Sequence, residues 1–194
     1  MAGGERVVEA ARASMRSDAE HNRARILAAA RAALGASSDA TLNSIAKVAG
    51  VGQGTMYRHF PNREALLLAV YRDEIDALLD AAPALLAEQP PLTALRTWFD
   101  RLAAYGRIKH GLAQAAEAAT RADLSHEYYP RVITAITLLL DAGKADGVLR
   151  PDVDADEVLL LVGFLWRLDN PGWEARSRHL LDLVMAGLRP ELSA

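Results

Sequence analysis

The chain has no cysteine, which excludes several kinds of chemistry at once. Disulfides, thiolate nucleophiles and cysteine-ligated zinc all require that residue, and its absence is typical of a protein kept in a reducing compartment. The sequence also lacks an apolar run long enough to span a membrane, and its N-terminus lacks the apolar core of a signal peptide. We therefore expect a cytoplasmic protein with no membrane partner.

Strand-forming patterns are scarce as well. Only 6% of the 194 residues are aromatic, and no run of β-branched residues alternates with polar ones. Alanine and leucine, both strong helix formers, dominate a chain that is 51% hydrophobic. The sequence predicts an all-α protein of about nine helices with a sizeable core.

Recognisable catalytic motifs are missing too. The five histidines have no partner histidine four residues away, and there is no GxSxG run and no glycine-rich phosphate loop. An acidic cluster lacks the twelve-residue loop and the glycine that calcium needs, so we interpret it as capping of a helix N-terminus: Asp152, Asp154, Asp156 and Glu157. An enzyme built on a helical bundle is an unfavoured alternative, and we expect no cofactor and no metal.

The most informative stretch covers residues 41–60, TLNSIAKVAGVGQGTMYRHF. Its first half has apolar residues at helical spacing, a threonine that can cap the helix and a glycine, Gly50, that can end it. A second helix follows and ends before Pro61. No carboxylate occurs from Gln53 to His59. These features predict a helix-turn-helix whose second helix enters the DNA major groove, with two packed helices of an ordinary bundle as the alternative.

Charge is spread unevenly along the chain. Residues 1–64 carry nine lysines and arginines against six carboxylates, whereas the remaining residues carry thirteen against nineteen. A basic N-terminal part on an acidic body is expected if only one end of the protein meets phosphate.

Three parts are expected along the chain. Residues 1–17 read as a mobile arm with some helical tendency, which either reaches DNA through its arginines or is a tail without a role. Residues 18–64 hold the helix-turn-helix domain, with its first helix capped near Ser17 or Asp18. Residues 65–194 form a helical body for ligand binding and dimerisation. Within it we expect a break or kink at Pro83, a short separate helix near 112–122 and a long helix over 154–168.

The helix-turn-helix stretch resembles the DNA-binding domain of the tetracycline-repressor (TetR) family over about residues 20–70. The resemblance rests on a turn, a recognition helix and the start of a fourth helix in the right order: Ile45, Ala46, Ala49, Gly50, Val51, Gly54, Thr55, Tyr57, His59, Phe60 and Arg63 through Leu66. It implies a homodimer that binds a palindromic double-stranded operator, and a small, largely apolar effector bound in the C-terminal body. A repressor released by that effector is the function we expect.

The resemblance also implies roles for individual residues. Gln53, Gly54 and Thr55 are expected to face the bases, and a glutamine side chain can make paired hydrogen bonds to an adenine edge. The expected backbone contacts are Thr41, Tyr57, His59 and Arg63. Gly52 stands where many members carry a small polar residue, so that a backbone N–H would have to serve there.

The body offers two further sets of candidates. The pocket candidates are aromatic or polar residues among alanines and leucines: Trp98, Tyr105, His110, Tyr128, Tyr129 and Trp166. The dimer candidates belong to the last two helices: Leu159, Val162, Gly163, Trp166, Leu181, Val184 and Leu188. Core packing is the alternative for each residue singly. A DNA-binding protein that responds to no ligand, with a body that only dimerises, is the alternative function.

Overall fold

The computed structural model describes the backbone of residues 2–36, 40–115, 118–166 and 172–190. Side chains are described for residues 17–34, 40–106, 120, 122–165 and 172–190. Within these ranges the fold is entirely helical, as the sequence predicts, and comprises eight α-helices and one 3₁₀-helix. No helix in them is long and apolar enough to cross a membrane. The chain divides into two compact units, Met1–Val70 and Tyr71–Ala194, so the division falls within one helix, α4.

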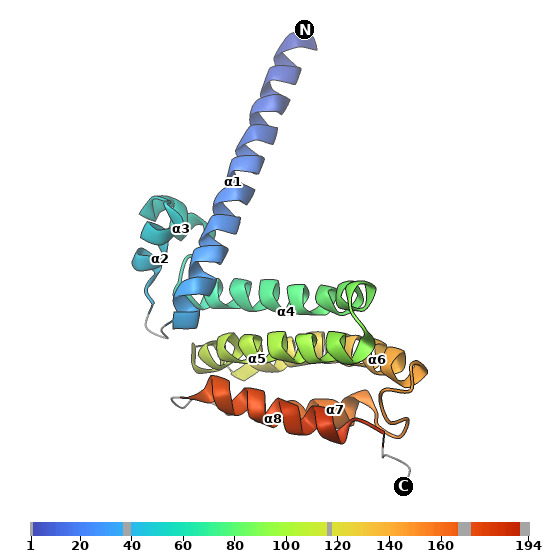
Figure 1. The fold of residues 1–194 in the computed structure, drawn as a ribbon. Coiled ribbons are helices and arrows are strands. Elements are labelled where there is room, and N and C mark those ends of the chain that lie inside the picture. The colour runs from blue at the N-terminus through green and yellow to red at the C-terminus, as the bar shows by residue number, and fades with distance from the viewer. Residues whose placement is uncertain (1, 37–39, 116–117, 167–171, 191–194) are drawn as a thin grey trace. The chain divides into compact units, whose positions relative to one another are not determined.

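The N-terminal unit contains three helices and the beginning of a fourth: α1 (Ala2–Ala36), α2 (Leu42–Ala49), α3 (Gln53–His59) and α4 (Arg63–Glu88). Figure 1 shows α2 and α3 beside the C-terminal half of α1, whose N-terminal half extends away from them. The expected start of the first helix near Ser17 or Asp18 is wrong. Residues 2–17 continue the same helix, since their alanines and glutamates are good helix formers that do not interrupt it.

Local capping fixes the ends of the short helices. Thr41 and Ser44 form a reciprocal capping box on α2, in which the Ser44 N–H donates to Thr41 Oγ1 over 3.2 Å and the Thr41 N–H donates to Ser44 Oγ over 3.1 Å. Gly50 ends α2 in the left-handed conformation, with φ +64°, which glycine adopts without a steric penalty. Asn62 caps α4, since its Oδ1 accepts from the Ala65 N–H over 2.8 Å. The cap at Thr41 and the helix end at Gly50 confirm the sequence prediction.

The core of this unit gathers one apolar face from each helix. Its fully or almost fully buried side chains come from every helix of the unit: Ile26, Ala30, Ile45, Ala46, Ala49, Met56, Phe60, Leu66, Leu67 and Val70. The faces of α2 and α3 turned away from this core are exposed. A helix as short as α3 is not stable alone in water, so its position depends on this packing.

The C-terminal unit packs its helices around a second core (Figure 1). It contains the rest of α4 and the helices α5 (Pro91–Ala115), α6 (Ala118–Ala145), α7 (Ala155–Leu161), the 3₁₀-helix η1 (Val162–Trp166) and α8 (Trp173–Gly187). Asp154 caps α7 in a box with Glu157, as the acidic cluster predicts: the Glu157 N–H donates to Asp154 Oδ1 over 2.8 Å.

Of the break or kink expected at Pro83, the break does not occur: α4 continues to Glu88, with the neighbouring Ala82 and Leu85 buried on either side of the proline. Two further boundaries expected in this unit are wrong. The short helix near 112–122 does not exist as a separate element, because α5 continues through Gly111, a residue that a helix tolerates at a modest cost. The long helix over 154–168 tightens into a 3₁₀-helix at Val162, beside the weak helix former Gly163.

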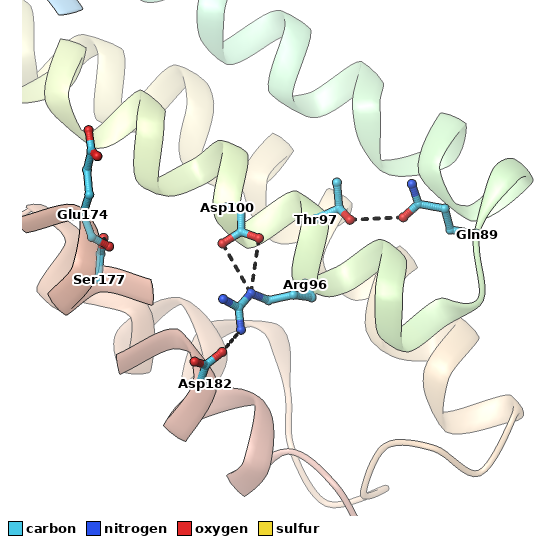
Figure 2. Close-up of polar contacts among 7 residues, drawn as sticks. All are labelled: Gln89, Arg96, Thr97, Asp100, Glu174, Ser177 and Asp182. Atoms are coloured by element: carbon cyan, nitrogen blue, oxygen red, sulfur yellow. Dashed lines mark hydrogen bonds and ion pairs between the residues drawn. The ribbon is translucent and has the colours of Figure 1, made fainter. Parts of the chain in front are cut away.

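Polar contacts connect α5 to α4 and to α8. Trp98 is fully buried, and its indole N–H donates to the Leu78 carbonyl over 2.8 Å, which joins α5 to α4 within this unit. Figure 2 shows the Arg96 guanidinium between Asp100 on its own helix and Asp182 on α8. The hydrogen bond from Arg96 lowers the pKa of the Asp182 carboxyl. Because these charges are exposed, the contact orients α8 more than it stabilises the fold.

The left-handed turn gives a first testable prediction. Gly50→Ala should lower the free energy of unfolding by about 1–2 kcal/mol, because an alanine is strained at positive φ. The added methyl would also overlap the Arg25 guanidinium. Gly54→Ala is the matched control, because a methyl there meets nothing within 4 Å and the residue is helical. It should leave stability unchanged or raise it by up to about 1 kcal/mol. Urea unfolding measures both, and equal losses would contradict the prediction.

Candidate nucleic-acid interface and cavity

The outward face of α3 is made of polar side chains over an apolar base. Met56 is buried beneath the helix, while Gln53 and Gly54 are exposed and Thr55 is half-buried. Space is open beside Gly54, where an added methyl would meet nothing within 4 Å. The three residues expected to face bases therefore lie together at the N-terminal end of α3, where the helix dipole is positive. Their role stays a prediction.

Arg58 also lies on this face, although it is not among the residues expected to contact DNA. Its Nε donates to the Gly54 carbonyl over 3.0 Å, and its Nη2 donates to Thr55 Oγ1 over 3.3 Å. The side chain thus runs back toward the start of α3, the direction that helical side chains favour. The guanidinium therefore lies at Gly54 and Thr55, one turn before its own Cα. The sequence places Arg58 on the outward face of this acid-free helix, but spacing does not show that its guanidinium reaches back to Gly54 and Thr55.

The residues expected to contact the DNA backbone differ in their exposure and in their present contacts. Tyr57 is exposed, and His59 is half-buried with its ring tilted against Phe60 at 6.2 Å. Thr41 is exposed, but its hydroxyl already belongs to the capping box of α2. Arg63 is half-buried at the start of α4. Their contacts with phosphate stay predictions.

Two arginines of α1 hold the turn and the end of α3. Arg25 Nη2 donates to the Gly50 carbonyl over 3.1 Å, and the Arg23 guanidinium lies 5.8 Å from the Phe60 ring centre. The first contact fixes the carbonyl of the left-handed residue between α2 and α3. The second is a cation–π contact at the residue that ends α3. The orientation of α3 thus depends on α1 as well as on its own core residue.

The C-terminal unit encloses a cavity of about 230 Å³. Four tyrosines and four aliphatic residues make up most of its wall, together with one serine: Tyr71, Ile75, Leu102, Tyr105, Ser125, Tyr128, Tyr129, Val132 and Leu159. Ser125 and Tyr129 are exposed, the latter by 52%, so the cavity reaches the surface beside them. The Tyr129 hydroxyl donates to Asp156 Oδ1 at the start of α7.

The cavity contains half of the expected pocket residues. Tyr105, Tyr128 and Tyr129 line it. Trp98 lies in the core with its indole bonded to Leu78, and the side chains of His110 and Trp166 lie outside those that the structure describes. The expected set missed Tyr71, which follows a wholly apolar run of α4. The missed serine and aliphatic lining residues, Ile75, Leu102, Ser125, Val132 and Leu159, carry no signal that separates them from core or surface positions.

The tyrosine hydroxyls around the cavity are held in their neutral form. Burial raises the pKa of Tyr105 far above its ordinary value, and it also raises the pKa of the neighbouring Tyr71. Burial likewise raises the pKa of Tyr128. The charges nearby occur as pairs: Arg72 Nη2 lies 3.2 Å from Glu127, and Arg131 Nη2 lies 2.9 Å from Asp76.

The expected dimer residues are mostly part of the protomer's own packing. Val162, Leu181 and Leu188 are buried, so they offer almost no surface to a partner. Leu159 lines the cavity, Gly163 and Val184 are half-buried, and the Trp166 side chain lies outside the described set. Large apolar side chains that are exposed on the same two helices were missed: Leu160, Leu161 and Leu183. The apolar spacing identified the inward face of each helix.

These features are those of a class of proteins: helix-turn-helix DNA-binding proteins with a separate all-helical body. Residues 26–70 match the family model for bacterial regulatory proteins of the tetR family, and residues 90–190 match that for the transcriptional regulator SbtR-like C-terminal domain. The chain therefore belongs to the TetR family of transcriptional regulators.

Individual relatives, two of them solved structures, support this assignment. A TetR transcriptional regulator, SCO0520 from Streptomyces coelicolor, is 41% identical, with 88% of this chain and 99% of that chain covered and a TM-score of 0.76. A TetR regulatory protein from Mycobacterium vanbaalenii is 30% identical, with 91% and 99% covered and a TM-score of 0.71. The transcriptional repressor KstR2 of Mycolicibacterium smegmatis is 31% identical over 61% of this chain and 62% of its own length. The matches span less than two thirds of the curated relatives.

The raised pKa of Tyr105 gives a second prediction. Below about pH 10 the tyrosine is protonated in both the folded and the unfolded chain, so its contribution to stability is constant. Above that pH the unfolded chain ionises and the folded chain does not, so stability falls as pH rises. Tyr105→Phe should therefore reduce the loss of stability between pH 9 and 11 by about 1 kcal/mol.

Urea unfolding at both pH values measures this difference. The control is Tyr57→Phe, which removes an exposed hydroxyl from the N-terminal unit and should leave the alkaline loss as in the unaltered chain. The same alkaline loss in Tyr105→Phe as in the unaltered chain would show that Tyr105 ionises freely in the folded state.

Proposed function

We propose that this regulator is a homodimeric repressor that binds a palindromic operator and is released when a small molecule occupies the cavity of its C-terminal unit. The observation that carries the DNA-binding part is the exposed, acid-free face of α3. The turn before this helix is held by the hydrogen bond from Arg25 of α1 to the Gly50 carbonyl. Such a helix can approach phosphates without charge repulsion and can be placed in the major groove at a fixed angle. A regulator of this kind would act in the cytoplasm, where chromosomal DNA is accessible.

Base reading is assigned to the N-terminal end of α3. Gln53 can bond an adenine edge bidentately, and the Thr55 methyl can contact a thymine methyl. The open space at Gly54 lets a base edge come close to the backbone. Arg58 adds a guanidinium to this end of the helix, and an arginine is the commonest partner of guanine.

Backbone positioning is assigned to residues around that end. Tyr57 and His59 lie further along α3, where side chains reach phosphates rather than bases. Thr41 and Arg63 flank the motif at the starts of α2 and α4. Phosphate contacts hold the register of the helix in the groove but do not distinguish sequences.

A palindromic operator requires a two-fold protein. The exposed leucines of α7 and α8 support dimerisation through these helices, since Leu160 is 80% exposed and Leu183 is 57% exposed. Large apolar side chains exposed at a surface commonly mark a protein interface. A symmetric dimer would present two copies of α3 to successive major grooves, about 34 Å apart.

The cavity supports ligand control. It is mainly apolar with a few hydroxyl groups, which is the usual composition of a small-molecule site. A ligand changes operator affinity only if it binds the DNA-competent and the released conformations unequally. The alternative is a regulator without an effector, in which case no compound that enters the cavity would change operator binding.

Two substitutions on α3 test the DNA-binding part. Gln53→Ala should change the base preference at one position of each half-site, at a cost of about 1–3 kcal/mol for the preferred base. Tyr57→Ala should weaken binding to all sequences by a similar factor without changing the preferred site. Operator selection from random duplexes with the purified protein, followed by gel shifts in a fixed salt concentration, measures both. The control is Val48→Ala, an exposed apolar position on α2. Unaltered preference and affinity in both α3 variants would overturn the assignment.

The dimer assignment has its own test. Leu160→Glu combined with Leu183→Glu places charges on two exposed positions, so folding should be preserved while self-association is lost. Light scattering after size-exclusion chromatography should show a monomer, and operator affinity should fall at least about 100-fold because half of the contacts are lost. Leu138→Glu on α6, a position 43% exposed, is the matched control and should stay dimeric. A double variant that remains a dimer would place the interface elsewhere.

A further inference from the structure

The wall of the cavity has an unusual share of aromatic rings. Four of the chain's five tyrosines line it, although only 6% of all residues are aromatic. Tyr71 contacts two of the others, with ring centres 5.3 Å from Tyr105 and 6.0 Å, edge to face, from Tyr128. Rings arranged in this way offer both faces and edges to a further ring. A flat aromatic ligand would extend this cluster, whereas a flexible alkyl chain would forgo the ring–ring contacts.

The volume limits the size of the ligand. An apolar cavity of about 150 Å³ accommodates benzene. At about 230 Å³, this cavity has room for roughly half as much again. That corresponds to a substituted single ring of about nine non-hydrogen atoms, and it excludes a steroid skeleton unless the walls move apart.

The charge of the wall limits the ligand further. All nine lining side chains are uncharged at neutral pH. The ionic groups beside the wall already have partners: Arg72 with Glu127, Arg131 with Asp76, and Asp156 with the Tyr129 hydroxyl. The Arg131 guanidinium also lies 5.0 Å from the centre of the Tyr128 ring. A carboxylate or ammonium inside the cavity would lose its hydration without gaining an opposite charge.

The hydroxyl groups give the ligand one polar position. Tyr71 and Tyr105 lie next to each other, with ring centres 5.3 Å apart, and both are almost fully buried. Two phenol groups have two O–H donors and several lone pairs between them. A neutral hydroxyl on the ligand could therefore join the pair as donor or acceptor.

We infer that the effector is a small, neutral, single-ring aromatic compound with one hydroxyl group, of the alkylphenol class. The ring occupies the space between the tyrosines and the aliphatic residues, its short alkyl group contacts the aliphatic wall, and its hydroxyl joins the Tyr71–Tyr105 pair. This inference rests on the ligand-binding part of the proposed function. For a ligand of this size the dissociation constant should be on the order of 10–100 µM.

Calorimetry on the purified chain without DNA tests the class. The probes share a similar size and differ in one property each: 4-ethylphenol, ethylbenzene without the hydroxyl, 1-octanol without the ring, and the charged 4-ethylbenzoate and phenethylamine. The expected order is 4-ethylphenol first, ethylbenzene roughly tenfold weaker, and no measurable binding of either charged compound. Tighter binding of 1-octanol or of a charged probe than of 4-ethylphenol would overturn the inference.

Two substitutions locate the binding site. Tyr105→Phe keeps the ring and should reduce 4-ethylphenol affinity about tenfold while leaving ethylbenzene affinity unchanged. Leu102→Trp should fill the cavity and abolish binding of both compounds, with Leu138→Trp on the exposed face of α6 as its matched control. Circular dichroism checks that each variant folds. If Leu102→Trp does not fold, Tyr105→Phe alone decides, and equal losses for both compounds in it would contradict the assigned hydroxyl contact.

Gel shifts on the selected operator separate this inference from the proposed function. Binding of 4-ethylphenol that releases the operator supports both. Binding without release keeps the ligand class and refutes control of DNA binding by the cavity. Release by a compound of another class, with no binding of 4-ethylphenol, keeps the proposed function and refutes the class.

Discussion

The left-handed turn at Gly50 is the constraint on which the DNA-binding unit depends. A positive φ at this residue ends α2 and redirects the chain, so that α3 begins only three residues later. The carbonyl of the same residue is held by Arg25 of α1. The placement of α1, α2 and α3 relative to one another thus depends on the backbone of this one residue. A substitution that changes this φ would alter the presentation of α3 even if each helix remained intact.

The N-terminal motif could be predicted in detail because its signals are local. Thr41 and Gly50 act within one turn of themselves, and Pro61 disfavours the helical conformation at the residue directly before it. The structure confirms the cap at Thr41 and the helix end at Gly50. Arg58 was missed for the opposite reason: its guanidinium lies at Gly54 and Thr55 because of its rotamer, which sequence spacing does not specify. The start of α1 was also missed, since Ser17 and Asp18 can cap a helix but do not have to.

The body was predicted less well because its residues are sorted by long-range packing. Spacing along α8 correctly identified Leu181 and Leu188 as one apolar face, yet this face is buried in the protomer and the exposed leucines lie elsewhere. Trp98 and Tyr105 look equivalent in the sequence. One is tied to the Leu78 carbonyl in the core, and the other lines a cavity. Only the arrangement of α4, α5 and α6 within this unit distinguishes them.

The uncharged wall of the cavity has a consequence for how such a regulator would be supplied with its signal. A neutral aromatic molecule partitions into a lipid bilayer and crosses it unaided, whereas an ion pays a large penalty in the hydrocarbon layer. The concentration that reaches the cavity would then follow the concentration outside the cell, without an uptake protein between them. If the cavity controls DNA binding, an uncharged lining would therefore couple the regulator to the composition of the surrounding medium.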